Sequence, residues 1–81
     1  MMTFHLTISR VGENLFDGEA RSIALPGTEG MFEVLAHHEA FVSRLRAGKA
    51  QGVAADGSPI HFEIPSGGIA EVSNNQATVL L

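Results

Sequence analysis

The chain has 81 residues, of which 44% are hydrophobic and 17% charged, a composition typical of one globular domain and not of a disordered segment. Its formal net charge of −4 argues against nucleic-acid binding, which needs a basic patch. Cysteine is absent, which excludes disulfides and thiolate metal sites, and no apolar run is long enough for a signal peptide or a membrane span. We therefore expect one domain over residues 1–81 with no direct membrane insertion.

The first third of the chain reads as strands separated by turns. Residues 4–9 alternate apolar and polar side chains, which is the period of a strand with one buried face. A turn is expected at residues 11–14, followed by a short strand at 15–18 that ends in an Asp-Gly turn signal. Residues 19–25 form a further strand, which Pro26-Gly27 should end because proline cannot donate to the ladder.

The middle of the chain holds the densest mixture of turn, apolar and ionisable residues. Residues 31–35 form a short apolar segment, and residues 36–39 have the length of one helical turn. From Ala40 to Arg46 the chain alternates as a strand again, and an Ala-Gly turn leads into a weak strand at residues 49–55. No helical period extends over this region, so we expect no long helix.

The remainder continues in the same pattern. Asp56-Gly57 is a strong hairpin signal, and residues 60–64 alternate cleanly between apolar and polar. Short strands are expected at residues 69–72 and 76–81, with an Asn-Asn turn between them. The fold class is therefore all-β, a β-sandwich of about nine to ten strands with turns at the spacing such folds require.

Strand alternation also predicts the core. The residues on the apolar side of each alternating strand should be buried, and they are Phe4, Leu6, Ile8, Ile23, Leu25, Phe62, Ile64 and Val79.

The sequence contains no motif that indicates a catalytic or a metal-binding site. His37 and His38 are adjacent, and neighbours in an extended segment point to opposite faces, so they would rarely share a metal. The segment Gly27–Gly30 lacks the lysine and the following helix of a phosphate loop. We expect no catalytic residue, no cofactor and no metal, and therefore no enzyme in this chain by itself.

The turn before Met31 suggests a contact surface instead. If Phe32 and Val34 point into the core, alternation sends Met31 and Glu33 outward. An apolar side chain at the tip of a polar turn is a common mark of an interface, and a flexible thioether suits an adaptable contact. A packed, non-functional tip is the alternative.

Several segments in order resemble a known family. They are Phe4-His5-Leu6, the LFDG of residues 15–18, the LPGTEGMFEVL of residues 25–35, the SGGIAEV of residues 66–72 and the ATVL of residues 77–80. Together they resemble the N-terminal β-sandwich domain of the epsilon subunit of F-type ATP synthases, the subunit called delta in mitochondria. The resemblance covers nearly the whole chain.

The resemblance implies a non-catalytic central-stalk subunit that couples the membrane rotor ring of c subunits to the gamma shaft and the catalytic head. Such a subunit lies at the cytoplasmic face of the inner or plasma membrane, or on the matrix side in mitochondria. The positions that match ring-facing residues are Glu29, Gly30 and Met31, and those that match residues facing the gamma shaft are Arg10, His38 and Ser43.

The chain departs from the family pattern at three places and at its end. Glu33 stands where glycine is usual, Ala36-His37 where proline-glycine is usual, and Glu39-Ala40 where alanine-proline is usual. No C-terminal helical hairpin follows Leu81, so we expect a chain that couples rotation without braking ATP hydrolysis. The competing hypotheses are a free-standing β-sandwich binding module for a peptide or small ligand, and a small metal-dependent enzyme.

Overall fold

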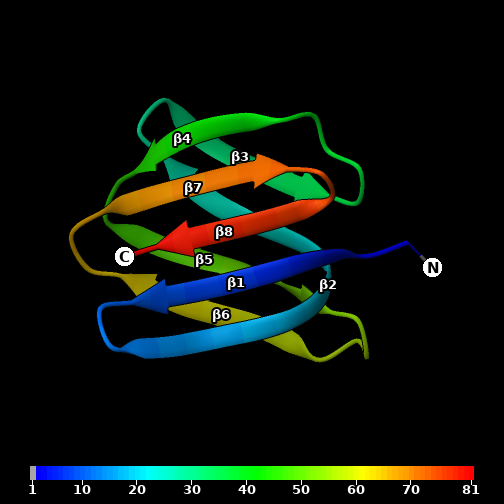
Figure 1. Cartoon of the computed structure of the whole chain (residues 1–81). Coiled ribbons are helices and arrows are strands. Elements are labelled where there is room, and N and C mark those ends of the chain that lie inside the picture. The colour runs from blue at the N-terminus through cyan, green and yellow to red at the C-terminus, as the bar shows by residue number, and fades with distance from the viewer. Residues whose placement is uncertain (1) are drawn as a thin grey trace.

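A computed structural model describes residues 2–81, which form strands and no helix (Figure 1). The all-β sandwich expected from the sequence is confirmed, with eight strands. In chain order they are β1 (Phe4–Arg10), β2 (Glu13–Gly27), β3 (Gly30–Leu35), β4 (Phe41–Leu45), β5 (Gly48–Ala54), β6 (Pro59–Ile64), β7 (Gly68–Ser73) and β8 (Gln76–Leu80).

The structure has eight strands, fewer than the nine to ten expected, because the strands expected at residues 15–18 and 19–25 form one continuous strand, β2. β2 runs for 15 residues without interruption, so the turn expected at Asp17-Gly18 is wrong. Gly18 is an ordinary ladder residue that pairs with Leu6 of β1. The strand ends at Gly27, as Pro26-Gly27 predicts, and Pro26 itself lies opposite Met31 near the end of the β2–β3 ladder. Its carbonyl accepts a hydrogen bond from the Arg46 amide at 2.9 Å.

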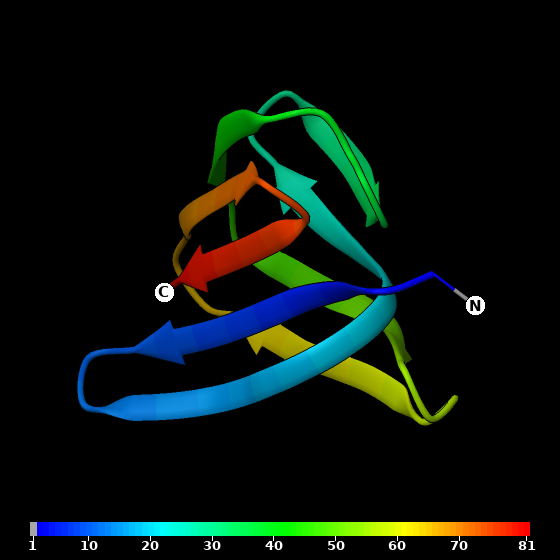
Figure 2. The same ribbon diagram turned by 45° about the vertical axis from the view of Figure 1, so that its right-hand side comes forward.

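The strands form two layers that share β2. Hydrogen-bonded neighbours follow the order β1-β8-β7-β4-β2-β5-β6, with β3 paired to β2 and with β1 also paired to β2. The first half of β2 pairs with β1, and its second half crosses to pair with β3 and β5. Figure 2 shows this long strand bending from one layer to the other.

The core lies between the layers and follows the predicted alternation. All the residues expected in the core are buried except Phe62, which is only partly buried. Phe62 lies in a crevice with Leu15 and Phe16, between β6 and the β1–β2 hairpin. β6 is the last strand in the sheet order, so no strand of residues 2–81 covers its outer edge. One side of the Phe62 ring therefore stays open to solvent.

A single tight turn at residues 36–37 stands where a helical turn was expected at residues 36–39. The His38 amide donates to the Leu35 carbonyl at 3.2 Å, and His37 has a φ of 62°. A single bond of this i to i+3 kind closes one turn, after which residues 38–40 run without regular structure into β4. The expected helical turn is therefore wrong.

Burial yields a stability prediction that separates core from surface. Leu25 has 0% of its surface exposed, so Leu25→Ala should destabilise the protein by about 2–5 kcal/mol. Val42 is 65% exposed, and Val42→Ala should change stability by less than about 0.5 kcal/mol. Chemical denaturation of the variants tests both. Equal losses in Leu25→Ala and Val42→Ala would contradict the assignment of the two faces.

Candidate functional site

The expected ring-facing residues lie together on the β2–β3 turn. Thr28 and Glu29 form the turn, and β3 begins at Gly30, whose φ of 130° suits glycine. Met31 is 56% exposed, whereas Val34 is buried, so the expected outward alternation of β3 holds. The turn therefore presents an acidic residue, a flexible glycine and one large apolar side chain.

This turn is tied to the strand beside it. The Thr28 amide donates to the Arg44 carbonyl at 3.0 Å, and the Arg46 amide donates to the Pro26 carbonyl at 2.9 Å. The Arg46 Nε also donates to the Gly27 carbonyl at 3.2 Å. Backbone bonds of this kind fix the direction of the turn, so the tip is an anchored projection and not a loose loop.

A second surface, the β3–β4 seam, consists of Phe32, His38, Phe41 and Ser43. Phe32 and Phe41 meet edge to face with ring centroids 5.0 Å apart, an arrangement that aromatic pairs favour. The His38 ring lies 4.9 Å from Phe41. Ser43 follows Phe41 by two residues on the same side of β4, and every residue of the seam is partly buried. The seam therefore combines aromatic surface with polar groups.

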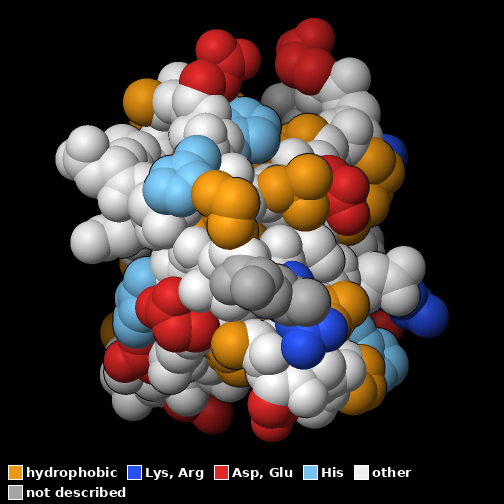
Figure 3. All heavy atoms as spheres, turned by 90° about the vertical axis from the view of Figure 1, so that its right-hand side faces the viewer, with side chains coloured by type: hydrophobic (Ala, Val, Ile, Leu, Met, Phe, Trp, Pro, Cys, Tyr) orange, Lys and Arg blue, Asp and Glu red, His pale blue; other side chains and the backbone are white. Residues whose placement is uncertain are grey.

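His38 is oriented by its own loop. Its Nδ1 lies 2.7 Å from the Glu39 carbonyl, which only accepts hydrogen bonds, so Nδ1 carries the proton. In the neutral ring Nε2 is then free to accept a hydrogen bond. This end of the molecule presents histidine and hydrophobic side chains next to one another (Figure 3).

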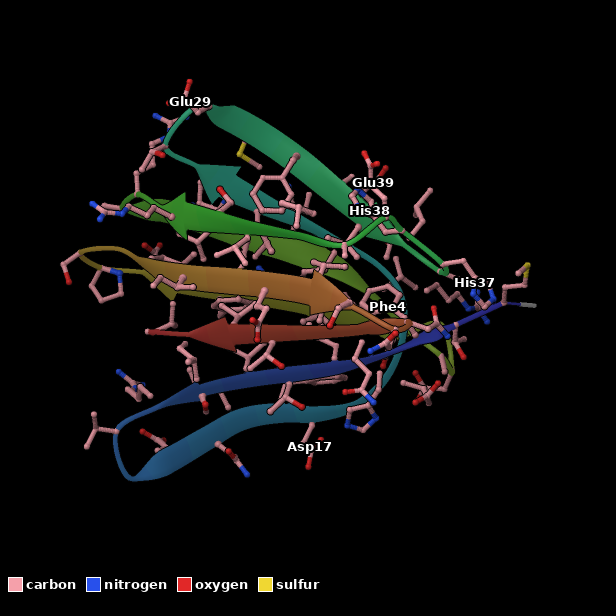
Figure 4. All side chains as sticks on the ribbon, turned by 45° about the horizontal axis from the view of Figure 1, so that its top comes forward. Phe4, Asp17, Glu29, His37, His38 and Glu39 are labelled. Carbon is pink, nitrogen blue, oxygen red and sulfur yellow. The ribbon has the colours of Figure 1, made fainter. Side chains whose placement is uncertain are left out.

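The structure brings His38 and Ser43 into one surface but places Arg10 elsewhere. β4, β8 and β1 run in the same direction, so Arg10 lies at the end of the sandwich that carries the β2–β3 turn. β1 starts beside the His37 turn, and an extended strand of its length separates its ends by about 20 Å. Figure 4 shows Glu29 and His38 near opposite ends of β3. Arg10 bonds Glu13 through its Nε at 3.1 Å.

Sequence reasoning missed a charged cluster between β1 and β2. His5 Nε2 lies 2.6 Å from Asp17 and Nδ1 lies 3.1 Å from Glu19. The hydrogen bond to Asp17, and then the one to Glu19, raise the pKa of His5 above its ordinary value. Hydrogen bonds from Thr3 and from His5 lower the pKa of Glu19. The pairing of β1 with β2 is what reveals this cluster, because it places His5, Asp17 and Glu19 on the same outward side of the two strands.

A shallow apolar groove lies beside the ends of β7 and β8. Ile69, Leu80 and Leu81 line a groove of about 570 Å³ beside Arg44 and the β6–β7 bend. Within residues 2–81 no cluster of three histidines or carboxylates is placed to hold a metal ion. The same part of the chain contains no helix of the length and apolarity needed to cross a membrane.

Comparison with known sequences identifies a family along nearly the entire chain. The family described as "ATP synthase, Delta/Epsilon chain, beta-sandwich domain" matches residues 3–81. The ATP synthase epsilon chain of Delftia acidovorans is 39% identical over 80 residues, which are 99% of this chain and 57% of the relative. That of Protochlamydia amoebophila is 38% identical over 79 residues, 98% of this chain and 53% of the relative. This chain thus spans little more than half the length of these curated relatives.

Solved structures agree with the fold. A chain in the Euglena gracilis mitochondrial ATP synthase structure of OSCP, F1 and c-ring superposes with a TM-score of 0.89 at 27% identity, covering 99% of this chain and 51% of that one. A chain in the Tetrahymena thermophila mitochondrial ATP synthase central stalk and c-ring superposes with a TM-score of 0.74 over 94% of this chain and 60% of that one. At 18% identity, this second likeness concerns the fold alone.

The His5 cluster predicts how stability changes with pH. Because folding raises the His5 pKa, its contribution is complete below the ordinary value of 6.5 and is lost as pH rises through the folded-state pKa. Because folding lowers the Glu19 pKa, its contribution is complete above 4.5 and is lost as pH falls through the folded-state value. The cluster should therefore stabilise most between these two values.

Urea denaturation at a series of pH values tests this expectation. The native chain should lose stability from mildly acidic to mildly alkaline pH, and His5→Gln should reduce that loss. Thr78→Val, on the outward side of the neighbouring strand, is the control and should keep the native pH profile. A His5→Gln profile parallel to that of the native chain would show that the cluster does not contribute.

Proposed function

The chain belongs to the delta/epsilon family of ATP synthase chains, and we propose that it is a non-catalytic central-stalk subunit that couples the membrane rotor ring to the gamma shaft and the catalytic head. The observation that carries this proposal is the family match over residues 3–81, which leaves almost none of the chain outside the domain. The subunit would lie at the cytoplasmic face of the inner or plasma membrane, or on the matrix side in a mitochondrion.

The anchored β2–β3 turn supports the contact with the rotor ring. Glu29, Gly30 and Met31 project from one end of the sandwich on a turn held by backbone hydrogen bonds. A ring of identical subunits presents the same polar loop repeatedly, and a thioether can adapt to small differences of register between neighbouring copies. Met31 is the residue expected to lose most solvent exposure in this contact.

The β3–β4 seam supports the contact with the gamma shaft. It carries two half-buried aromatic rings, and aromatic residues are enriched at protein interfaces because one side of the ring can pack while another meets the partner. The free Nε2 of His38 and the Ser43 hydroxyl add polar groups to the same surface. Arg10 would reach the shaft only where the shaft extends along the sandwich toward the ring.

A coupling subunit must transmit torque without deforming. The two layers share β2, which pairs with four other strands and leaves few routes by which the layers can slide past each other. The β2–β3 turn and His38 also lie at opposite ends of β3, so a load between these two points would run along the strands. Strands are stiffest in that direction because their covalent backbone carries the load.

A free-standing binding module remains the second candidate, and one observation favours it. The groove beside Arg44 and Leu81 is large enough for a short apolar peptide or a small ligand. Size-exclusion chromatography with the gamma subunit separates the two functions, because a stalk subunit co-migrates with gamma and a module of unrelated function elutes alone.

The proposed ring contact predicts a selective loss of coupling. Met31→Glu puts a charge at the apolar centre of the contact, where burial without a partner is unfavourable. Vesicles containing the reconstituted synthase should then pump fewer ions per ATP hydrolysed, while the variant still co-migrates with gamma.

Leu35→Glu is the matched control for this prediction. Leu35 has 50% of its surface exposed against 56% for Met31, and it lies on the same outward side of β3, at the end of the strand away from the β2–β3 turn. We expect Leu35→Glu to leave the pumping ratio unchanged. A Met31→Glu complex with the native ratio would mean that the turn does not bear on the ring.

A further inference from the structure

The hairpin between β7 and β8 ends in a turn of two asparagines whose side chains are used differently. Asn74 and Asn75 have φ values of 51° and 59°, the paired left-handed geometry of a type I′ hairpin turn. Asparagine tolerates this region better than most residues other than glycine. The left-handed backbone explains why asparagine occupies both positions. It does not explain a hydrogen bond from either carboxamide to another segment of the chain.

The Asn75 carboxamide connects segments that are far apart in sequence. Its Oδ1 accepts a hydrogen bond from the His37 amide at 2.7 Å, and its Nδ2 donates to the Thr3 carbonyl at 2.9 Å. The Asn75 carbonyl also accepts from the His5 amide at 3.1 Å. One residue thus joins the start of β1, the β7–β8 hairpin and the turn that follows β3.

The turn at Ala36-His37 depends on support from outside itself. The φ of His37 is 62°, a region that side chains other than glycine, asparagine and aspartate adopt at a cost. The preceding residue is alanine, which does not fix φ as proline would at this place in a turn. Only the 3.2 Å bond from the His38 amide to the Leu35 carbonyl closes the turn internally.

The direction of this turn decides where the His38 ring lies. Residues 38–40 have no regular structure, so the place of the His38 ring 4.9 Å from Phe41 is set by the turn before it, by β4 after it and by its own Nδ1 bond to the Glu39 carbonyl. A hydrogen bond to the His37 amide holds the Ala36–His37 peptide group, which lies one peptide before the one that leads into His38. Holding that peptide therefore restricts the path by which the chain enters the β3–β4 seam.

We propose that Asn75 is a positioning residue that holds the Ala36-His37 turn and thereby presents His38 in the orientation the gamma shaft contacts. This inference rests on the proposed function for the identity of the partner. Asn75 itself would not touch the shaft. Its effect would be to raise the fraction of molecules whose seam is already in the binding conformation, which raises the apparent affinity in the same proportion.

Two glycine variants of the hairpin isolate the carboxamide. Asn75→Gly keeps a residue that favours the left-handed backbone and removes both side-chain bonds. Asn74→Gly makes the same change at the neighbouring position, whose side chain makes none of the hydrogen bonds described here. Both variants are expected to fold, and their stabilities by denaturation provide the check.

The first measurement needs no partner. Amide hydrogen exchange of the free protein should show the His37 amide exchanging at least about tenfold faster in Asn75→Gly, because its acceptor is lost. In Asn74→Gly its rate should stay native. An unchanged rate in Asn75→Gly would overturn the proposed hydrogen bond whatever the chain binds.

The second measurement is the affinity for the isolated gamma subunit by calorimetric titration. Asn75→Gly should bind about tenfold more weakly than the native chain, corresponding to a turn that is in the binding conformation about a tenth of the time. Asn74→Gly should bind with native affinity. Combining Asn75→Gly with Ala36→Pro and His37→Gly should restore binding, because proline and glycine build the same turn without outside support.

The outcomes separate the inference from the proposed function. Native affinity in Asn75→Gly, together with fast exchange at His37, would show that Asn75 holds the turn but does not position the shaft contact. Failure of the proline-glycine rescue would also count against a role through the turn. A native chain that does not bind gamma would contradict the proposed function, and the exchange rates alone would then decide whether Asn75 holds the turn.

Discussion

The continuity of β2 is the constraint on which the rest of the fold depends. This strand pairs with β1, β3, β4 and β5, so a break in it would separate the two layers and release the hairpin that carries Met31. β5 approaches it so closely that a Cβ at Gly52 would lie 2.1 Å from the Ser22 carbonyl oxygen, and only glycine fits there. The register of β2 against β5 shifts next to this contact, between Ala20 and Ser22.

The shared strand also positions the two proposed contact surfaces. The β2–β3 turn and the His38 loop lie at opposite ends of β3, within a molecule whose longest dimension is 33 Å. Each is held by bonds from another element, the first by Arg44 and Arg46 near the end of β4 and the second by Asn75 from the β7–β8 hairpin. Each surface is therefore held partly by bonds from outside its own loop.

The sequence predicted the strands and most of the core because alternation is a local signal. It failed where long-range pairing overrode local chemistry, as at Gly18, which reads as a turn but pairs with Leu6 across the β1–β2 ladder. Phe62 alternates like a core residue, and only the sheet order reveals that β6 is an edge strand. Alternation as well as resemblance indicated Met31, whereas Arg10, His38 and Ser43 came from resemblance alone. The separation of Arg10 from His38 became clear only from the strand directions. The role of Asn75 depends on a contact 38 residues away and has no local signal.

The central claim is that this chain joins the rotor ring at one end to the gamma shaft at the other. Because the sequence has no cysteine, single cysteines can be introduced as unambiguous cross-linking sites. In the assembled complex, Glu29→Cys should cross-link to a ring subunit, His38→Cys should cross-link to gamma, and Gln51→Cys on the outer face of β5 should cross-link to neither. Cross-linking of the Glu29 and His38 positions to the same partner, or of neither position to any stalk component, would contradict the account.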